Sequence, residues 1–257
     1  MRAARLLFDV GDEVICERSM ITVKDDGLWV MPPIIRSLAF GWYPPIPPPV
    51  RIHGVELADL GLTGSGLPTQ RSPWNLIGRW RDDGLHVTRW VPYELPPALG
   101  VSRSVHPPGP APPGGWPWVD DTLEGGPRVP PGVLADLTER GVVVAATIFW
   151  PTRNQPVWVV TAGDRAEAET ALRPYVGDAL CIVESRIRAA EVAAIDATLR
   201  ARCGDWGIYQ YVKSIDDDGQ LRFIVRIMGM LPDVVAWAEP YSAAWLRIIS
   251  WLRPVGT

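Results

Sequence analysis

The sequence predicts an α+β fold, in which a β-rich antiparallel N-terminal half precedes a ferredoxin-like (βαββαβ) α/β sandwich. The first observation is that Asp-Asp-Gly occurs three times between β-favouring segments, at 22–30, 79–87 and 215–225. Asp-Gly between apolar runs is a strong hairpin signal, because glycine supplies the positive φ that a tight turn needs. The second observation is that the chain from residue 179 onward alternates strand-like and helix-like segments in the order β-α-β-β-α-β.

A third observation sets the domain boundaries. Residues 92–132 are rich in proline and glycine, which is typical of a connection between folded parts. We therefore expect a β-rich antiparallel sheet or small barrel over 1–91, a linker or packed strap over 92–132, and the ferredoxin-like domain over 133–257. A second proline-rich run, 42–50, is expected to be an extended loop, since proline cannot donate to a sheet.

The second hairpin shows how the turn would set the register. If Asp83 and Gly84 form a two-residue loop, Trp80 pairs with Val87. Alternation then places apolar side chains mostly on one face, as expected for a sheet covered on one side. That apolar face consists of Leu76, Trp80, Leu85, Val87 and Val91, and the polar face of Arg79, Arg81, His86 and Thr88, with Trp90 beside Arg79.

The elements of the second half follow from local patterns. Asp164 with Glu167 resembles a helix cap and predicts a helix over 165–173 that closes before Pro174. Apolar spacing predicts another helix over 188–202, and Pro232 opens a helix over 232–238. The strands expected outside the third hairpin lie at 142–150, 156–161, 179–183 and 245–252.

Four short segments give the chain its resemblance to known sequences. They are GlyGlyTrpProTrpValAsp at 114–120, ThrAlaGlyAspArgAlaGluAlaGluThrAlaLeuArg at 161–173, AlaLeuCysIleVal at 179–183 and GlyArgTrpArgAspAspGlyLeuHisValThr at 78–88. In these the chain resembles an uncharacterised actinobacterial protein family. The resemblance implies an origin and no activity.

Composition and charge narrow the class of protein. Apolar residues make up 47% and charged residues 21%, as in a folded soluble protein. The net charge of −4 gives no reason to expect nucleic acid or a membrane surface as partner. The longest apolar run, 142–150, is half a membrane span, so we expect a cytoplasmic protein.

Cysteine usage gives no sign of a cofactor or metal. Cys16, Cys181 and Cys203 are odd in number and have no CxxC spacing. This pattern excludes a disulfide framework and disfavours zinc. We expect no cofactor, and no metal site.

The leading functional hypothesis is a non-catalytic binding protein. The chain has 13 Trp, most of which we expect to fill cores. Aromatic residues in proline-rich loops are hard to bury, and exposed aromatic patches mark recognition sites. We expect a protein partner, with a small molecule as a further option and the oligomeric state left open. The candidate binding residues are Trp42, Tyr43, Trp90, Trp116 and Trp118.

Two alternatives belong to other classes. One is a small-molecule sensor that uses an ACT-like C-terminal sandwich. The other is a hydrolase that uses His86 or His53 with nearby carboxylates. We expect Arg81 to face His86 across the strand. No complete catalytic set assembles from the sequence, and the candidate carboxylates are Asp82, Asp83, Glu56 and Asp59.

Overall fold

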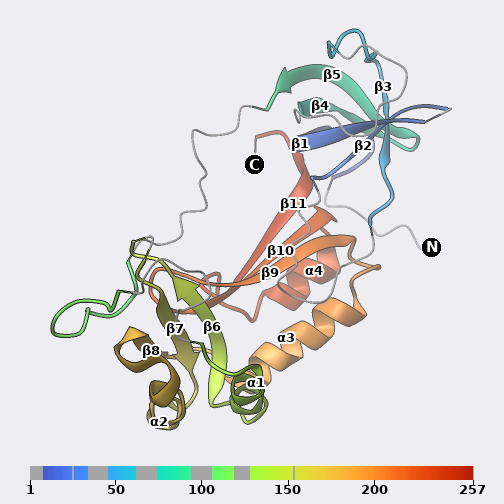
Figure 1. Ribbon diagram of the computed structural model, residues 1–257. Helices are drawn as coiled ribbons and strands as arrows, with labels where there is room; N and C mark the ends of the chain where they lie inside the picture. The colour runs from blue at the N-terminus through green and yellow to red at the C-terminus, as the bar shows by residue number, and fades with distance from the viewer. Residues whose placement is uncertain are drawn as a thin grey trace.

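The chain folds into two β-sheets with helices packed against both of them (Figure 1). A computed structural model describes residues 8–24, 26–33, 46–61, 74–93, 106–118, 128–152 and 154–256. Among these residues the structure is mixed α and β and rich in strands, as the sequence predicts. No helix in this part of the chain is long and apolar enough to cross a membrane.

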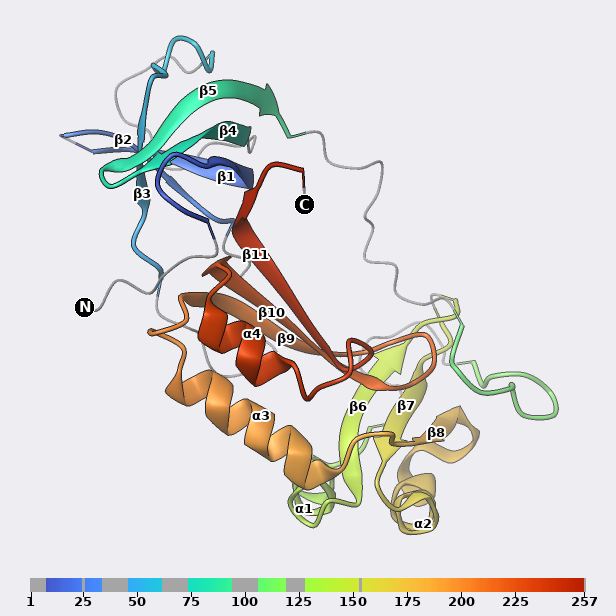
Figure 2. The same ribbon diagram turned by 180° about the vertical axis from the view of Figure 1, so that it is seen from behind.

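The larger sheet has eight strands in the order β2-β3-β5-β4-β1-β11-β10-β9. Its strands in chain order are β1 (Glu13–Lys24), β2 (Gly27–Met31), β3 (Val50–His53), β4 (Trp74–Arg81), β5 (Gly84–Pro92), β9 (Ile208–Ile215), β10 (Leu221–Gly229) and β11 (Leu246–Pro254). The last strand, β11, pairs antiparallel with β1 and parallel with β10. One sheet therefore contains strands from both ends of the sequence, and β11 can be followed from one part into the other (Figure 2).

The smaller sheet has three strands in the order β6-β7-β8. They are β6 (Val143–Phe149), β7 (Val157–Ala162) and β8 (Leu180–Glu184). The helices α1 (Pro131–Glu139) and α2 (Arg165–Val176) pack against this sheet, and a 3-10 turn, Gly177–Ala179, leads from α2 into β8. The helices α3 (Ala189–Ala201) and α4 (Pro232–Ala238) instead cover one face of β9, β10 and β11 (Figure 2).

The ferredoxin-like arrangement of the C-terminal half is not confirmed. The elements β8-α3-β9-β10-α4-β11 follow one another in the predicted order. A ferredoxin-like sandwich needs all four strands in one sheet, but β8 pairs with β7 in the smaller sheet. The two β-branched strands before it, β6 and β7, supply this alternative partner.

Two helices differ from the sequence prediction. The helix α2 ends later than predicted, and the helix α1 was not predicted. Asp164 caps α2 through its carboxylate, which accepts from the Glu167 backbone N–H at 2.9 Å, as predicted. The helix continues past Pro174 to Val176 instead of closing before it. The helix α1, which begins at the end of the proline-rich region, was not predicted, although Pro131 stands at its first turn, where the lost N–H costs little.

The three Asp-Asp-Gly hairpins all form, but the register of the second one was predicted wrongly. Arg81 pairs with Gly84, so Asp82 and Asp83 form the loop, and Trp80 pairs with Leu85. A bulge between Ile77 and Gly78 then shifts the rest of the ladder. As a result Arg79, and not Arg81, faces His86, and Trp90 pairs with Leu76.

Several apolar clusters hold these layers together. One lies under β1 to β5 and includes Leu76 and Leu85, and another lies between β9–β11 and the helices α3 and α4 around Phe223. A third fills the space between the smaller sheet and its two helices. Most described tryptophans contribute to such packing, and Trp206 and Trp251 are both 3% exposed.

Candidate functional site

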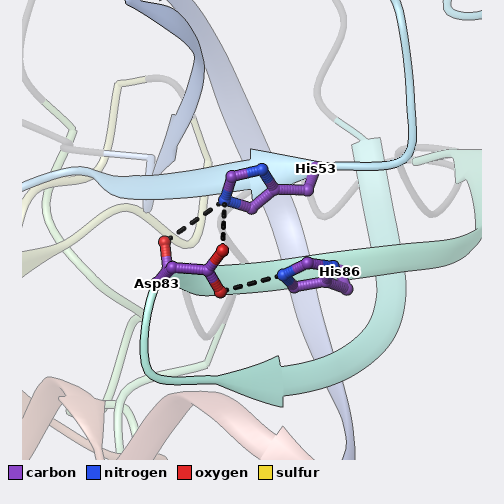
Figure 3. Close-up of side chains that lie close together, drawn as sticks. All are labelled: His53, Asp83 and His86. Carbon is purple, nitrogen blue, oxygen red and sulfur yellow. Dashed lines mark hydrogen bonds and ion pairs between the residues drawn. The ribbon is translucent and has the colours of Figure 1, made fainter.

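The side chains of His53, Asp83 and His86 meet beside the turn between β4 and β5, at the end of β3 (Figure 3). The strands β3 and β5 are parallel neighbours, and His53 stands directly opposite His86 in their register. The third residue, Asp83, lies in the turn between β4 and β5, which brings its carboxylate beside both imidazoles. The end of β3 and the β4–β5 hairpin, which are distant in the sequence, thus build one cluster.

The geometry of the cluster is tight. Nε2 of His86 lies 2.9 Å from Oδ1 of Asp83, and Nε2 of His53 lies 3.4 Å from Oδ2. Nε2 of His53 is also 3.3 Å from the backbone oxygen of Asp83. The two imidazoles are stacked, with centroids 4.6 Å apart and planes inclined by 21°. One ligand atom from each of the three residues lies within 4.8 Å of the others.

The electrostatics of the cluster keep Asp83 ionised. The hydrogen bond from His86 lowers the pKa of the Asp83 carboxyl below its ordinary value, and the charges of the two imidazoles act in the same direction. The imidazole side chains are each 27% exposed and the carboxylate is 58% exposed. An anionic, solvent-accessible carboxylate therefore lies between two imidazole nitrogens.

Two glycines let the backbones approach closely enough to form the cluster. A Cβ on Gly84 would lie 2.3 Å from the Arg51 backbone oxygen, and its φ is +135°. A Cβ on Gly78 would lie 2.2 Å from the backbone oxygen of His86. Any side chain at either position would push apart the strands that carry the cluster.

The donor set is suited to a divalent transition-metal ion. Two imidazole nitrogens and one carboxylate form a common three-residue set for zinc and non-haem iron, with further positions left for water or substrate. An imidazole nitrogen binds a metal ion in the plane of its ring. Because the two ring planes are nearly parallel, binding requires at least one ring to turn toward the other, and their partial exposure leaves room for this.

The other predicted carboxylates do not join the cluster. Asp82 is exposed in the same turn but is not among the converging residues. The Asp59 carboxylate accepts from the Glu56 backbone N–H at 2.8 Å, which closes a local turn. Within the described ranges, both imidazoles form hydrogen bonds to Asp83, and neither is bonded to a hydroxyl or thiol nucleophile.

The predicted aromatic binding residues do not form one surface among the residues that the structure describes. Trp42 and Tyr43 lie outside the described residues. Trp90 packs against the cluster under β1 to β5, and its Nε1 donates to the Asp59 backbone oxygen at 3.3 Å. Trp116 is partly buried against the far side of the smaller sheet, whereas Trp118 is 68% exposed.

Local sequence patterns do not pair His53 with His86, which are 33 positions apart. The signal that could have joined them is the short β-favouring segment around His53, which becomes β3. Its parallel pairing with β5 is a long-range contact with no local signature.

Comparisons with known proteins name no relative for this chain. A scan against protein-family models found no match, and searches of curated proteins and of solved structures found none either.

Proposed function

We propose that this protein binds a divalent transition-metal ion, with Zn²⁺ as the first candidate, through His53, Asp83 and His86. The observation that carries the proposal is the convergence of three ligand atoms within 4.8 Å of one another. Zinc accepts nitrogen and oxygen ligands at about 2.0–2.2 Å, so binding requires at least one imidazole to turn and the hydrogen bonds to Asp83 to give way to bonds with the ion.

The environment of the cluster also supports a metal ion. Asp83 is ionised and supplies a negative charge, so the ion would not be bound by neutral ligands alone. The partial exposure of all three side chains leaves coordination positions facing solvent. Three protein ligands with open positions are typical of zinc sites that bind water or substrate, and a closed structural site has four.

The hydrolase alternative is supported by the same residues. A metal ion held by three protein ligands can lower the pKa of a bound water molecule and so provide a nucleophile. This route does not need the serine or cysteine partner that the imidazoles lack. Asp82, Glu56 and Asp59 have no part in it.

Calorimetric titration of ZnCl₂ into the purified, chelator-treated chain tests the proposal. We expect one bound ion per chain. The variants His53→Asn, Asp83→Asn and His86→Asn should each weaken binding by at least about tenfold, since loss of even an outer-shell partner costs 10–100-fold. Titration of Co²⁺ followed by visible absorption reports independently on the ligand set.

Two matched variants serve as controls. Asp82→Asn removes the neighbouring carboxylate, and His106→Asn removes the third histidine of the chain. Both should bind zinc like the wild type. Equal zinc affinity in all five variants, or no binding by the wild type at millimolar zinc, would contradict the proposal.

A second candidate function is recognition of a protein partner through the segment that carries Trp118. The exposure of this indole, 68%, favours it. Its neighbour Trp116 is fixed, because its ring packs on the smaller sheet and its backbone oxygen accepts from Gln155 Nε2 at 2.9 Å. A large aromatic side chain is therefore presented from an anchored backbone, as in binding hot spots.

Affinity capture with the wild type and with Trp118→Ala tests this second function. The expected result is a partner, identified by mass spectrometry, that the wild type retains and the variant loses. The purified partner should then bind the wild type at least tenfold more tightly than the variant. Capture of the same proteins by both would count against recognition through Trp118.

A further inference from the structure

A small cavity opens where β1 leaves its pairing with β11. The ladder between these strands ends at Cys16 and Leu252, and the cavity lies just beyond, with a volume of about 50 Å³. This volume has room for roughly three or four water molecules. Its polar lining consists of Glu17, Arg18, Tyr209, Gln210, Arg226 and Ser250.

Arg18 reaches this cavity because the backbone is bent there. Its φ is +52°, and it is the only non-glycine residue with positive φ in the part of the chain that the structure describes. The bend coincides with an irregularity in the pairing of β1 with β4, and the Arg18 backbone N–H donates to Asn75 Oδ1 at 3.1 Å. Positive φ at a side-chain-bearing residue is uncommon and strained, and such residues cluster at functional sites.

The guanidinium of Arg18 is only partly satisfied. It lies over the ring of Tyr93, with Cζ 5.1 Å from the centroid. Its Nε is buried and has no hydrogen-bond partner. A buried donor without a partner costs free energy unless a ligand or water accepts from it.

A second guanidinium stands across the cavity. Arg226 on β10 is hydrogen-bonded to the hydroxyl of Tyr209, a β9 residue that is only 4% exposed. Burial raises the pKa of Tyr209, while the two nearby positive charges act against this rise. The phenol therefore remains a neutral hydroxyl group at the cavity wall.

The positive charge at this cavity is not balanced by a carboxylate. Among the described residues, neither Arg18 nor Arg226 has an acidic group within ion-pair distance. The one acidic residue of the lining, Glu17, forms an ion pair with Arg253. Two arginines with no counter-ion among the described residues are unexpected in a chain whose net charge is −4.

We propose that this cavity binds a small oxyanion, a phosphate or a carboxylate group, between Arg18 and Arg226. Guanidinium groups recognise such oxygens through charge-assisted hydrogen bonds, and the free Nε of Arg18 supplies one donor. The cavity volume suits an ion of four or five heavy atoms and excludes a larger ligand from complete enclosure. This site shares no residue with the proposed metal site.

Titration of the wild type with sodium phosphate, sodium acetate and sodium chloride at equal ionic strength tests the proposal. Binding is followed by heat change and by the thermal midpoint. We expect saturable binding of phosphate or acetate and no comparable effect of chloride. Phosphate alone would identify a phosphate site and acetate alone a carboxylate site. Equal, non-saturating effects of all three salts would overturn the proposal.

Variants locate the binding. Arg18→Gln and Arg226→Gln should each lower the affinity for the anion by at least tenfold. Arg247→Gln is the matched control, because Arg247 is an exposed residue of β11 outside the cavity lining. Unchanged affinity in both cavity variants, with loss in Arg247→Gln, would place the anion elsewhere.

The conservative variant Arg226→Lys covers the case in which a glutamine variant fails to fold. This variant retains the positive charge but not the planar fork of donors. It should therefore fold, and it should bind the anion more weakly than the wild type does. Wild-type affinity in this variant would contradict a site built on the Arg226 guanidinium.

Discussion

At the residue scale, Asp83 gives the candidate metal site its character. Its carboxylate bridges two imidazoles that come from strands 33 positions apart in the sequence. The hydrogen bond from His86 keeps this carboxyl ionised. The two imidazoles alone would offer no anionic ligand, and the carboxylate without the rings would be an ordinary exposed acid.

The three cysteines should be unreactive in the folded protein. Cys16, Cys181 and Cys203 are all buried. Burial raises the pKa of each thiol, to about 11 for Cys203. At pH 8 roughly one Cys203 thiol in a thousand would then be ionised, and the thiolate is the reactive form.

A thiol-specific chromogenic reagent checks this expectation. We predict no rapid reaction of the native chain at pH 8, and reaction of all three thiols after denaturation in urea. Fast modification of any one cysteine in the native state would show that its surroundings are open.

Phe223 is a second residue whose replacement has a clear expected effect. Its side chain is fully buried, at 0% exposure, in the cluster between β10 and the helices above it. Phe223→Ala should lower the free energy of unfolding by about 3–5 kcal/mol, because it leaves a cavity. Val235→Ala, at a side chain 45% exposed on α4, is the control and should change it by less than about 1 kcal/mol. Urea unfolding followed by tryptophan fluorescence measures both.

At the element scale, the turn between β4 and β5 shows what local signals can and cannot fix. Asp-Asp-Gly predicted the hairpin correctly, but the loop consists of Asp82 and Asp83, not of Asp83 and Gly84. Gly84 is needed for a different reason, which is the close approach of the Arg51 backbone on β3. Gly84 was therefore predicted as a turn residue, but in the structure it allows β3 to lie close to β5.

Gly84→Ala should separate β3 from β5 and weaken the candidate site. The added Cβ meets backbone at 2.3 Å, and φ is +135°, so we expect a loss of stability of about 1–3 kcal/mol. Zinc affinity should fall with it, because His53 and His86 lie on those two strands. Gly132→Ala is the control: apart from its chain neighbours and its own helix backbone, a Cβ added there would have no atom within 4 Å, and Gly132 lies in α1. It should be neutral or slightly stabilising. Equal stabilities of the two variants would contradict the proposed close approach.

How well each helix could be predicted depended on how clear its local sequence signals are. The start of α2 and the whole of α3 follow from a cap and from apolar spacing. The helix α1 was hidden by the prolines that precede it, because proline marks both helix starts and loops. Local patterns give the type of an element more reliably than its ends.

At the scale of the whole molecule, β11 links the two ends of the chain through its antiparallel pairing with β1 and its parallel pairing with β10. The Trp251 indole adds a hydrogen bond to the Glu17 backbone oxygen at 2.9 Å. No local pattern reports a contact between residues so far apart in sequence. This is why the strands could be predicted while their arrangement into sheets could not.

The shared sheet should make its two ends unfold together. Phe223→Ala weakens the part around β10, and we expect it to lower the urea midpoint of amide protection in β4 and β5 as well. Hydrogen exchange measured by mass spectrometry resolves these segments. Lower protection confined to β9, β10, α3 and α4 would show that the two parts of the sheet unfold independently.

The central claim is that His53, Asp83 and His86 bind a metal ion, and anomalous diffraction from crystals grown with Zn²⁺ tests it most directly. We predict one strong peak about 2.0–2.2 Å from Nε2 of His53, Nε2 of His86 and a carboxylate oxygen of Asp83. The same crystals of Asp83→Asn should show the peak weakened or absent. A wild-type structure with zinc elsewhere, and with His53 and His86 still stacked on each other and hydrogen-bonded to Asp83, would contradict the account.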